Sequence, residues 1–442
     1  MTDNVIFTVQ PGGHLAGEAR VPGDKSISHR SIMLASLAEG VTEVSGFLEG
    51  EDSLATLQAF RDMGVRIDGP ENGRVTIHGV GLHGLKPPAG PLYVGNSGTS
   101  MRLLAGLLSG QGFDAHLTGD ASLSGRPMRR VTDPLALMGA VIGTAENGTA
   151  PLDICGDQPL HGIDFEMPVA SAQVKSALLL AGLYAKGRTC VTEPAPTRDH
   201  TERMLAGFGY PLERDGATAC VTGGGKLTAT PVEVPADISS AAFFMVGASI
   251  SEGSDLTLRH VGINPTRIGV INILRAMGGD LTLSNEREVG GEPVADIRVR
   301  AAKLKGIRID EAQVPLAIDE FPALFVAAAC AEGETVLTGA SELRVKESDR
   351  IQVMADGLQA LGVDARPSED GIVIQGRARE EEPIGSGRVS SHGDHRIAMA
   401  FAMAALRAGG PIVIDDCANV NTSFPDFVGL ARQCGLDIRA ED

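Results

Sequence analysis

Six stretches of the chain are apolar at nearly every position and are long enough to form short helices. A helix that is apolar on every face is buried on every face. The pattern therefore predicts six core helices, within the ranges His29–Leu37, Met101–Leu108, Val174–Tyr184, Ala241–Ile250, Phe321–Ala331 and Ile397–Leu406.

A second kind of helix, amphipathic in pattern, follows each apolar stretch. In the fifth example Ile351, Met354, Leu358 and Leu361 have the spacing of one helical face, with polar residues between them. Short segments rich in Val, Ile and Thr, such as Gly371–Ile374, lie between the helices and predict strands. The chain therefore alternates between helices and short strands.

Glycines at regular intervals indicate that one segment is repeated. A glycine closes each apolar stretch, because a left-handed residue commonly ends a helix. A second set closes the amphipathic helices, with spacings of 69 to 84 residues, at Gly64, Gly139, Gly209, Gly278, Gly362 and Gly435. Six copies in register predict an α/β chain of six βαβαββ repeats, each with one buried helix and one helix on the flank of its sheet.

Two proline-containing connectors divide the repeats three and three. They are Val21–Asp24 and Pro231–Asp237. We expect residues 1–22 together with 237–442 to form one lobe and residues 23–236 to form a second lobe. The strand pair before the first connector then belongs with the C-terminal half, and the two connectors form a hinge.

Polar residues precede each apolar stretch. Backbone N–H groups at a helix start are unpaired and carry about half a positive charge, so that they bind anions readily. If three parallel helices fill each lobe, their starts open on one face of it. Two facing lobes would then enclose an active-site cleft that attracts phosphate and carboxylate groups.

Two interpretations of these polar residues stay open. Ser, Asp, Asn and Thr commonly cap helix N-termini, and for Asp237, Ser239 and Ser240 capping explains the residue types as well as ligand binding does. Capping does not explain a cation at a helix start, because its charge opposes the helix dipole. An anionic ligand is therefore indicated by Lys25, Arg30, Arg102 and Arg396.

Two loops add further charge. Ser122–Arg130 contains three arginines, and Leu343–Arg350 alternates cations with anions. Such loops are usually solvated surface. The second loop falls where the repeat predicts a strand-to-helix turn, at the level of the helix starts, and we therefore interpret it as part of a binding site.

The charge balance disfavours several classes of protein. Lys and Arg number 38 against 56 Asp and Glu, giving a net charge of −18, and no basic tail is present. A general nucleic-acid or anionic-membrane surface is therefore disfavoured. No apolar run is long enough to span a bilayer, and Met1–Asn4 does not begin a signal peptide. We expect a soluble, cytoplasmic monomer.

The six cysteines predict core residues rather than cross-links. None of them falls in a CxxC pair, which suggests a reducing compartment with neither a disulfide nor a zinc site. They are Cys155, Cys190, Cys220, Cys330, Cys417 and Cys434.

Other motifs fail in their context. Gly79–Gly84 fits GxGxxG, but the prolines that follow prevent the helix that a dinucleotide-binding turn needs. His392, Asp394 and His395 have the spacing of metal ligands, yet the neighbouring Arg396 disfavours a bound cation. We therefore expect no metal site and no dinucleotide cofactor.

Five motifs together carry a family resemblance. They are Gly23–Arg30, Gly95–Thr99, Gly119–Met128, Arg344–Arg350 and Asp394–Met399. In these motifs, and over essentially its whole length, the chain resembles the 5-enolpyruvylshikimate-3-phosphate (EPSP) synthase family. The resemblance implies a two-lobed inside-out α/β barrel with buried parallel helices.

The resemblance also implies a reaction. The family transfers the enolpyruvyl group of phosphoenolpyruvate to the 5-hydroxyl of shikimate 3-phosphate and releases phosphate, on the shikimate pathway to chorismate and the aromatic amino acids. The hydroxyl adds to C2 of the enolpyruvyl group, the methylene carbon is protonated, and phosphate leaves the tetrahedral intermediate. This chemistry needs a base and an acid but neither a metal nor an organic cofactor.

Roles carry over to the matching positions of this sequence. The base would be Asp319, whose place before an apolar stretch also leaves a capping role open, and the acid would be Lys25 or Glu347. Shikimate 3-phosphate would contact Lys25, Ser26, Arg30, Ser171, Ala172, Gln173, Arg198, Asp319 and Lys346. Phosphoenolpyruvate would contact Lys25, Gly98, Arg126, Gln173, Glu347, Arg350 and Arg396.

The sequence departs from the better-known branch of the family at three places. Asn419–Pro425 lacks a lysine before its Thr and Phe-Pro, Leu343 stands where an aromatic residue is common, and Ala172 replaces a second serine. These features resemble the second class of the family. Gly98 leaves room for glyphosate, the inhibitor that targets this family.

Two other functions fit the sequence less well. The related enolpyruvyltransferase that acts on UDP-N-acetylglucosamine uses a cysteine before its Arg-Pro, and Asp120–Pro127 contains none. A ring-shaped DNA clamp is also acidic and has six repeated parts, but its DNA-facing helices would need Lys and Arg along their length. The apolar stretches of this chain do not provide them.

Overall fold

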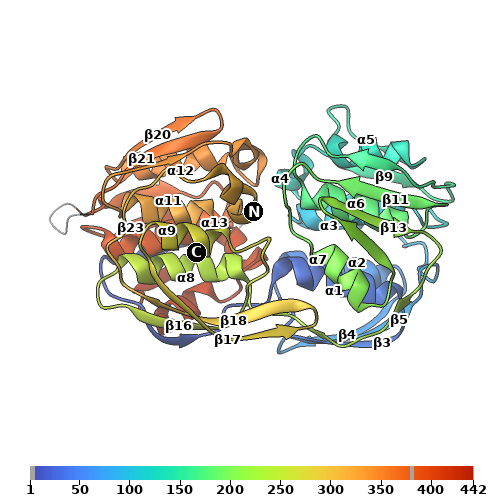
Figure 1. Cartoon of the computed structure of the whole chain (residues 1–442), viewed down its shortest axis with the longest axis horizontal. Coiled ribbons are helices and arrows are strands. Elements are labelled where there is room, and N and C mark those ends of the chain that lie inside the picture. The colour runs from blue at the N-terminus through green and yellow to red at the C-terminus, as the bar shows by residue number, and fades with distance from the viewer. Residues whose placement is uncertain (1–4, 379–382, 442) are drawn as a thin grey trace. The chain divides into compact units, whose positions relative to one another are not determined.

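The computed structural model describes residues 5–378 and 383–441, and the chain divides into two compact units (Figure 1). Unit 1 contains the chain up to Pro22, Pro235–Glu288 and the chain from Pro293 onward. Unit 2 contains Gly23–Val234 and Val289–Glu292. Each unit has its own hydrophobic core.

The core of unit 2 is built on three buried helices. They are α1 (Lys25–Leu37), α3 (Gly98–Leu108) and α6 (Ala172–Gly182). The shorter or more exposed helices are α2 (Glu51–Asp62), α4 (Ala121–Ser124), α5 (Arg129–Leu137) and α7 (His200–Gly207).

Three sheets pack around these helices in unit 2. The first contains β3 (Ala38–Ser45), β4 (Arg66–Glu71), β5 (Arg74–Val80), β14 (Leu227–Thr228) and β15 (Val232–Glu233). The second contains β6 (Leu92–Tyr93), β7 (Ala115–Thr118), β8 (Val141–Gly143) and β9 (Leu152–Cys155). The third contains β10 (Asp164–Glu166), β11 (Arg188–Thr192), β12 (Leu212–Asp215) and β13 (Thr218–Thr222).

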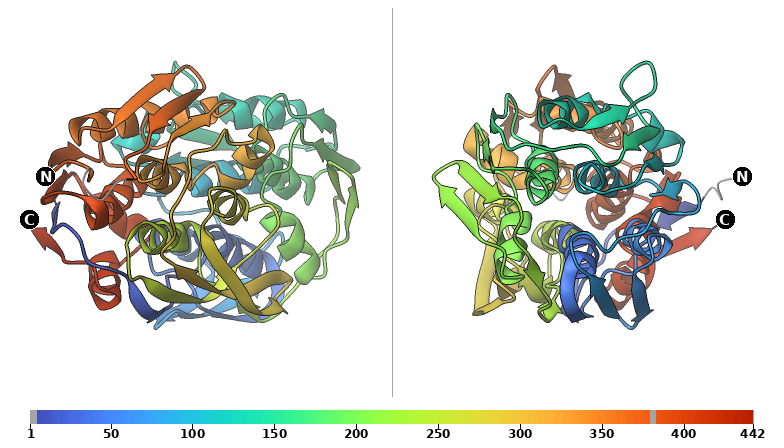
Figure 2. Two further views of the ribbon diagram at one scale, coloured as in Figure 1. Left: turned by 60° about the vertical axis from the view of Figure 1, so that its left-hand side comes forward. Right: turned by 90° about the vertical axis from the view of Figure 1, so that its right-hand side faces the viewer.

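Unit 1 is built in the same manner. Its buried helices are α8 (Ile238–Ile250), α11 (Phe321–Ala329) and α13 (His395–Ala404), which pack against one another and lie side by side in Figures 1 and 2. The remaining helices are α9 (Gly269–Ala276), α10 (Val314–Ala317), α12 (Arg350–Ala360) and α14 (Phe427–Cys434). Short 3₁₀ helices are η1 (Glu311–Gln313), η2 (Ser341–Val345), η3 (Ala405–Arg407) and η4 (Ala418–Thr422).

The three sheets of unit 1 include strands from both ends of the chain. The first contains β2 (Ala16–Ala19), β16 (Asp255–Gly262), β17 (Asp280–Val289) and β18 (Glu292–Arg300). The second contains β19 (Glu334–Leu337), β20 (Asp364–Ser368) and β21 (Gly371–Gln375). The third contains β1 (Ile6–Val9), β22 (Gly387–Ser390), β23 (Ile412–Asp415) and β24 (Ile438–Glu441).

Strand pairing follows one pattern in these sheets. In the sheet of β10 to β13, β10 is parallel to β11, and β11 and β12 are both antiparallel to β13. The sheet of β22 repeats this pattern, since β22 is parallel to β23 while β23 and β24 are both antiparallel to β1. The fold is therefore a mixed α/β fold with a recurring sheet topology.

The predicted core helices are confirmed by six buried helices. All residues of α8 and α11 are buried, and α13 leaves only Arg396 partly exposed. The observed helices begin a few residues before the apolar stretches, for example at Lys25 instead of His29. An apolar pattern omits the polar first turn, although that turn is helical.

The amphipathic helices are also confirmed. Ile351, Met354 and Leu358 in α12 are fully buried, whereas Asp356 on its other face is exposed. The six glycines that follow these helices all have positive φ, from +76° to +117°. Glycine adopts this backbone without the strain that a side chain would add.

The prediction that no disulfide forms is wrong. Cys190 in β11 and Cys220 in β13 are directly opposite each other, with their Cα atoms 4.2 Å apart, and they form a disulfide bond. The strand register creates this proximity, and a separation of 30 residues in sequence does not reveal it. The prediction of core thiols is confirmed for Cys330, Cys417 and Cys434, which are free and buried.

Two further observations concern the described residues. No helix starts after Gly79–Gly84, so that the dinucleotide-binding turn is missing there. Within residues 5–378 and 383–441, every helix falls short of the length and hydropathy that a membrane span requires.

Candidate active site

The starts of the buried helices confirm the capping interpretation at five positions. In each case a side-chain oxygen accepts a hydrogen bond from a backbone N–H of the first turn. The capping residues are Asp24 of α1, Ser97 of α3, Ser171 of α6, Asp237 of α8 and Asp394 of α13. Ser239 and Ser240 lie inside α8, behind its cap.

Helix α11 begins differently, and Asp319 is not its cap. The N-cap position is taken by Glu320, which makes no side-chain capping bond, and Pro322 occupies the first turn. Asp319 instead lies in the turn between α10 and α11. Its carboxylate is therefore available for contacts with cations from other elements.

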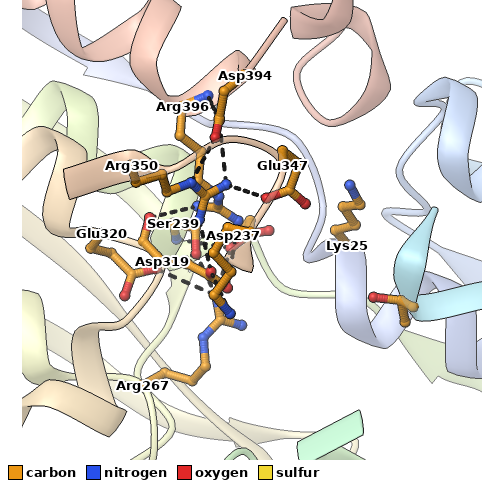
Figure 3. Close-up of polar contacts among 12 residues, drawn as sticks. Lys25, Asp237, Ser239, Arg267, Asp319, Glu320, Glu347, Arg350, Asp394 and Arg396 are labelled. Carbon is orange, nitrogen blue, oxygen red and sulfur yellow. Dashed lines mark hydrogen bonds and ion pairs between the residues drawn. The ribbon is translucent and has the colours of Figure 1, made fainter. Parts of the chain in front are cut away.

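Arg350 is the centre of the polar cluster of unit 1 (Figure 3). Its guanidinium is fully buried and donates from Nε to Asp394 Oδ2 at 2.8 Å, from Nη1 to Asp319 Oδ1 at 3.1 Å, and from Nη2 to Glu347 Oε2 at 2.6 Å. Burial opposes the charged form, but Asp394, Glu347 and Asp319 outweigh it and raise the pKa of Arg350 above its usual range. Arg350 is therefore a permanent cation that ties three carboxylates together.

Two more cations reach Asp319. Lys346 Nζ lies 3.6 Å from Oδ1, and Arg396 Nη2 lies 3.9 Å from Oδ2 while its Nη1 donates to the backbone oxygen of Asp319 at 3.1 Å. Asp319 is 8% exposed. The structure thus brings the predicted residues Asp319, Lys346, Glu347, Arg350 and Arg396 together in unit 1.

In unit 2, Gly98 lies directly beneath two arginines. A Cβ atom at Gly98 would stand 3.0 Å from Arg102 Nη1 and 3.2 Å from Arg126 Nη1, so that a side chain would displace them. Arg126 Nη2 also donates to Asn96 Oδ1 at 2.6 Å. Arg102 Nη1 donates to Gln173 Oε1 at 2.5 Å, which joins the starts of α3 and α6.

The start of α1 holds Lys25 and Arg30 in different surroundings. Lys25 is paired with Asp52 in the first turn of α2. Arg30 is buried and donates from Nε to Thr201 Oγ1 at 2.7 Å and from Nη2 to Ser176 Oγ at 2.9 Å. Burial lowers the pKa of Arg30 to about 10, still well above neutral pH.

The other predicted residues of unit 2 lie at the helix starts or in a loop. Ser26 accepts from Arg30 Nη1 through its backbone oxygen at 3.0 Å, and Ala172 is the first residue of α6. Arg198 lies in the loop before α7, where its charge acts against that of Arg30. The predicted site residues therefore form two groups, one in each unit.

Several contributing residues were absent from the predicted site. Lys175 is almost fully buried in α6 and pairs with Glu193 at 2.9 Å and with Glu202 at 2.7 Å. Glu193 also accepts hydrogen bonds from Thr197 N and Oγ1, at 3.2 and 2.6 Å, which fixes the loop that carries Arg198. The sequence signal for Lys175 is a lysine in the first turns of an apolar helix, where its charge opposes the helix dipole as that of Lys25 does.

In the sequence HGDHR at 392–396, Asp394 forms an ion pair with Arg350. Asp394 accepts from Arg350, and its Oδ1 accepts from Arg396 N at 3.0 Å. Among the described residues, no group of three or more His, Cys, Asp and Glu has the arrangement of a metal site. The segment lacking a lysine forms η4, where Asn419 Nδ2 donates to Gly393 O at 2.7 Å.

Comparisons with known proteins agree over nearly the full chain. A sequence model of the family described as EPSP synthase (3-phosphoshikimate 1-carboxyvinyltransferase) matches residues 9–430. A 3-phosphoshikimate 1-carboxyvinyltransferase from Alkalilimnicola ehrlichii is 71% identical over 99% of this chain and 97% of the relative. One from Methylococcus capsulatus is 72% identical over 98% of each chain.

Solved structures give the same result. The EPSP synthase of Acinetobacter baumannii has a TM-score of 0.89 and 63% identity, covering 99% of this chain and all of that chain. The enolpyruvyl transferase NikO of Streptomyces tendae, at 18% identity, has a TM-score of 0.76 over 99% of each chain and shows the shared fold alone.

Fold and relatives together define a transferase of mixed α/β architecture. The chain belongs to the EPSP synthase family, the 3-phosphoshikimate 1-carboxyvinyltransferases of the shikimate pathway.

Proposed function

We propose that the chain transfers the enolpyruvyl group of phosphoenolpyruvate to the 5-hydroxyl of shikimate 3-phosphate and releases phosphate through a tetrahedral intermediate. The observation that carries this proposal is the 71% identity to a 3-phosphoshikimate 1-carboxyvinyltransferase over 99% of the chain. Both substrates are anions, which suits the cations at the helix starts of each unit.

In this proposal Asp319 is the base that accepts the proton of the substrate hydroxyl. Its carboxylate lies among Lys346, Arg350 and Arg396, which hold it in one orientation. Arg350 fixes Oδ1 by a direct hydrogen bond. A carboxylate that is held in this way is already oriented to accept a proton before the reaction begins.

Protonation of the methylene carbon falls to Lys25 or Glu347. An ammonium and a protonated carboxyl can both deliver a proton to carbon. The resulting methyl group loses one proton as phosphate leaves, which restores the double bond. Glu347 is bonded to Arg350, and Lys25 is bonded to Asp52, so that each candidate has a fixed partner. The two candidates belong to different units, and substitution of each tells them apart.

Arg126, Arg350 and Arg396 are proposed to bind phosphoenolpyruvate, together with Lys25, Gly98, Gln173 and Glu347. Arginine forks match the two oxygens of a carboxylate or phosphate. Arg126 donates to the neutral acceptors Asn96 Oδ1 at 2.6 Å and Ser122 Oγ at 3.2 Å, and Arg396 donates to the backbone oxygen of Asp319 at 3.1 Å. Arg350 is engaged by three carboxylates, and we propose that phosphoenolpyruvate replaces one of these partners.

Shikimate 3-phosphate is proposed to bind Lys25, Ser26, Arg30, Ser171, Ala172, Gln173, Arg198, Asp319 and Lys346. The buried Arg30, and Arg198 whose charge acts on it, supply two cations that suit an anionic ligand.

We also propose that the recurring sheet topology reflects six βαβαββ repeats, three in each unit, forming the inside-out α/β barrel of the resembled family. Residues 1–22 with 237–442 would be one lobe and residues 23–236 the other. The monomer, with no nucleic-acid or membrane partner, is part of the same proposal.

The test is release of phosphate from phosphoenolpyruvate by the purified chain with different acceptors. We expect release with shikimate 3-phosphate and none with UDP-N-acetylglucosamine, and no retention of DNA. Release that depends on the UDP-sugar, or that needs no acceptor, would contradict the proposal.

A further inference from the structure

A second buried polar cluster lies at the starts of α8 and α11. Its members are Asp237, Ser239, Arg267 and Glu320, whose exposed fractions are between 1% and 5%. Arg267 Nη2 donates to Asp237 Oδ1 at 3.1 Å and to Ser239 Oγ at 2.6 Å, and Ser239 Oγ donates to Glu320 Oε1. Figure 3 shows the four side chains converging.

Hydrogen bonds to backbone atoms also hold the side chains of the cluster in place. Asp237 caps α8 by accepting from Ser239 N at 2.8 Å. Glu320 N donates to Ala317 O at 2.9 Å, and Glu320 O accepts from Leu324 N at 3.1 Å. Glu320 is thus held at both its side chain and its backbone, where α10 turns into α11.

Glu320 is the direct neighbour of Asp319. Fixing the side chain of Glu320 restricts the peptide bond between the two residues, whose carbonyl oxygen belongs to Asp319 and accepts from Arg396. A buried ionic cluster is a poor source of stability, since hydrophobic replacements often do as well. Its position beside the proposed base therefore points to a role other than stability.

We propose that Glu320, Ser239 and Arg267 are positioning residues that hold Asp319 in the orientation required for proton abstraction. This inference rests on the proposed role of Asp319 as base. Misplacement of a reacting group by about 1 Å can cost roughly a hundredfold in rate, and the cluster restricts such movement.

The three charged members of the cluster also act on Asp319, and they do not all act in the same direction. Asp237 and Glu320 are like charges to the Asp319 carboxylate, and Arg267 is an opposite charge. The cations that face Asp319 are Lys346, Arg350 and Arg396. Two carboxylates, Glu347 and Asp394, share Arg350 with it. None of these is altered in the variants below.

The experiment compares Glu320→Gln, Arg267→Gln and Ser239→Ala. Ser249→Ala is the matched control, because Ser249 is a buried serine at the far end of the same helix α8, bonded to Met245 O at 2.8 Å. For each variant kcat, the KM values, the pH profile of kcat and the temperature of unfolding are measured.

We expect kcat to fall roughly 10- to 100-fold in the three variants while KM changes by less than about threefold. The acid limb of the pH profile moves to lower pH in Glu320→Gln, because a like charge is lost, and to higher pH in Arg267→Gln. It stays in place in Ser239→Ala, which changes no charge. Ser249→Ala keeps the parent kcat.

The inference is overturned if Glu320→Gln and Ser239→Ala have kcat within about twofold of the control. It is also overturned if the loss of kcat in these variants is explained by a smaller folded fraction and the pH profile of Glu320→Gln does not move. Should Arg267→Gln fail to fold, Arg267→Lys keeps the charge and is expected to lose kcat without a shift of the profile. Asp319→Asn separates the two proposals. If it keeps its turnover the role of Asp319 fails, whereas an inactive Asp319→Asn beside fully active cluster variants refutes only the positioning role.

Discussion

Arg350 Nη1 lies 3.1 Å from Asp319 Oδ1, and the buried guanidinium of Arg350 is bonded at the same time to Glu347 and Asp394. Residues at the starts of α12 and α13 and in the turn before α11 are therefore linked through one side chain. Asp319 does not cap α11, since Glu320 takes the N-cap position of that helix.

Asp319→Asn is expected to lose roughly 10²- to 10⁴-fold in turnover, because an amide cannot accept the hydroxyl proton. The asparagine carbonyl can still accept from Arg350, so that folding and binding of shikimate 3-phosphate stay close to those of the parent. Steady-state kinetics and calorimetry check this. Asp310→Asn is the matched control, because Asp310 is an exposed cap of η1 and asparagine caps equally well. Turnover of Asp319→Asn within a few-fold of the control would remove the residue from the mechanism.

Arg126→Ala and Arg396→Ala are each expected to weaken binding of phosphoenolpyruvate far more than binding of shikimate 3-phosphate. Each variant loses charge-assisted hydrogen bonds worth about 1.5–3 kcal/mol, or roughly ten- to a hundredfold in affinity. Titration calorimetry with each ligand measures the two effects. Equal losses for both ligands would mean that the assignment of these arginines is wrong.

Arg350→Ala is expected to behave differently from these two variants. It leaves Asp319, Glu347 and Asp394 without their shared cation, and breaking a buried ion pair commonly costs about 3–5 kcal/mol. We therefore expect a lower unfolding temperature as well as weaker phosphoenolpyruvate binding. A variant with weaker binding but parental thermal stability would show that the buried contacts contribute little.

Lys175→Met is expected to destabilise unit 2 by about 3–5 kcal/mol, because it leaves Glu193 and Glu202 buried without their shared cation. Differential scanning calorimetry measures the change. Lys186→Met, at an exposed position, is the control and is expected to be neutral. Like stabilities of the two variants would refute a structural role for the buried lysine.

His29 makes stability depend on pH. Burial, together with the charges of Lys25 and Arg30, lowers its pKa well below 6.5, so that the folded chain holds this residue neutral. Below pH of about 6.5 the unfolded chain binds a proton that the folded chain does not, and stability falls as the pH falls. His29→Asn should lose this part of the pH dependence between about pH 6.5 and 5. Parallel unfolding curves for both proteins over that range would contradict the prediction.

The apolar pattern located the six buried helices because burial on every face leaves a continuous signal in sequence. It could not locate their polar first turns, so that α1 begins at Lys25 and not His29. The disulfide between Cys190 and Cys220 was missed because it depends on the register of β11 against β13. Tertiary pairing of this kind has no local pattern.

The site was predictable in its residue types but not in its pairing. The family resemblance indicated Asp319, Glu347 and Arg350, whereas their mutual hydrogen bonds depend on how α11 and α12 pack. Glu320 had the pattern of an ordinary helix start and proved to be buried against Ser239. Only its apolar surroundings in sequence hinted at burial.

The central claim is that the chain transfers an enolpyruvyl group by addition and elimination at C2 of phosphoenolpyruvate. The most direct measurement uses phosphoenolpyruvate labelled with a heavy oxygen isotope in the bridge between carbon and phosphorus, with shikimate 3-phosphate as acceptor in deuterium oxide. Our account predicts that the released phosphate keeps the heavy oxygen, since the bond from C2 to oxygen breaks, and that deuterium enters the methylene group of the product. Heavy oxygen retained in the organic product, or phosphate released without any carboxyvinyl product, would contradict it.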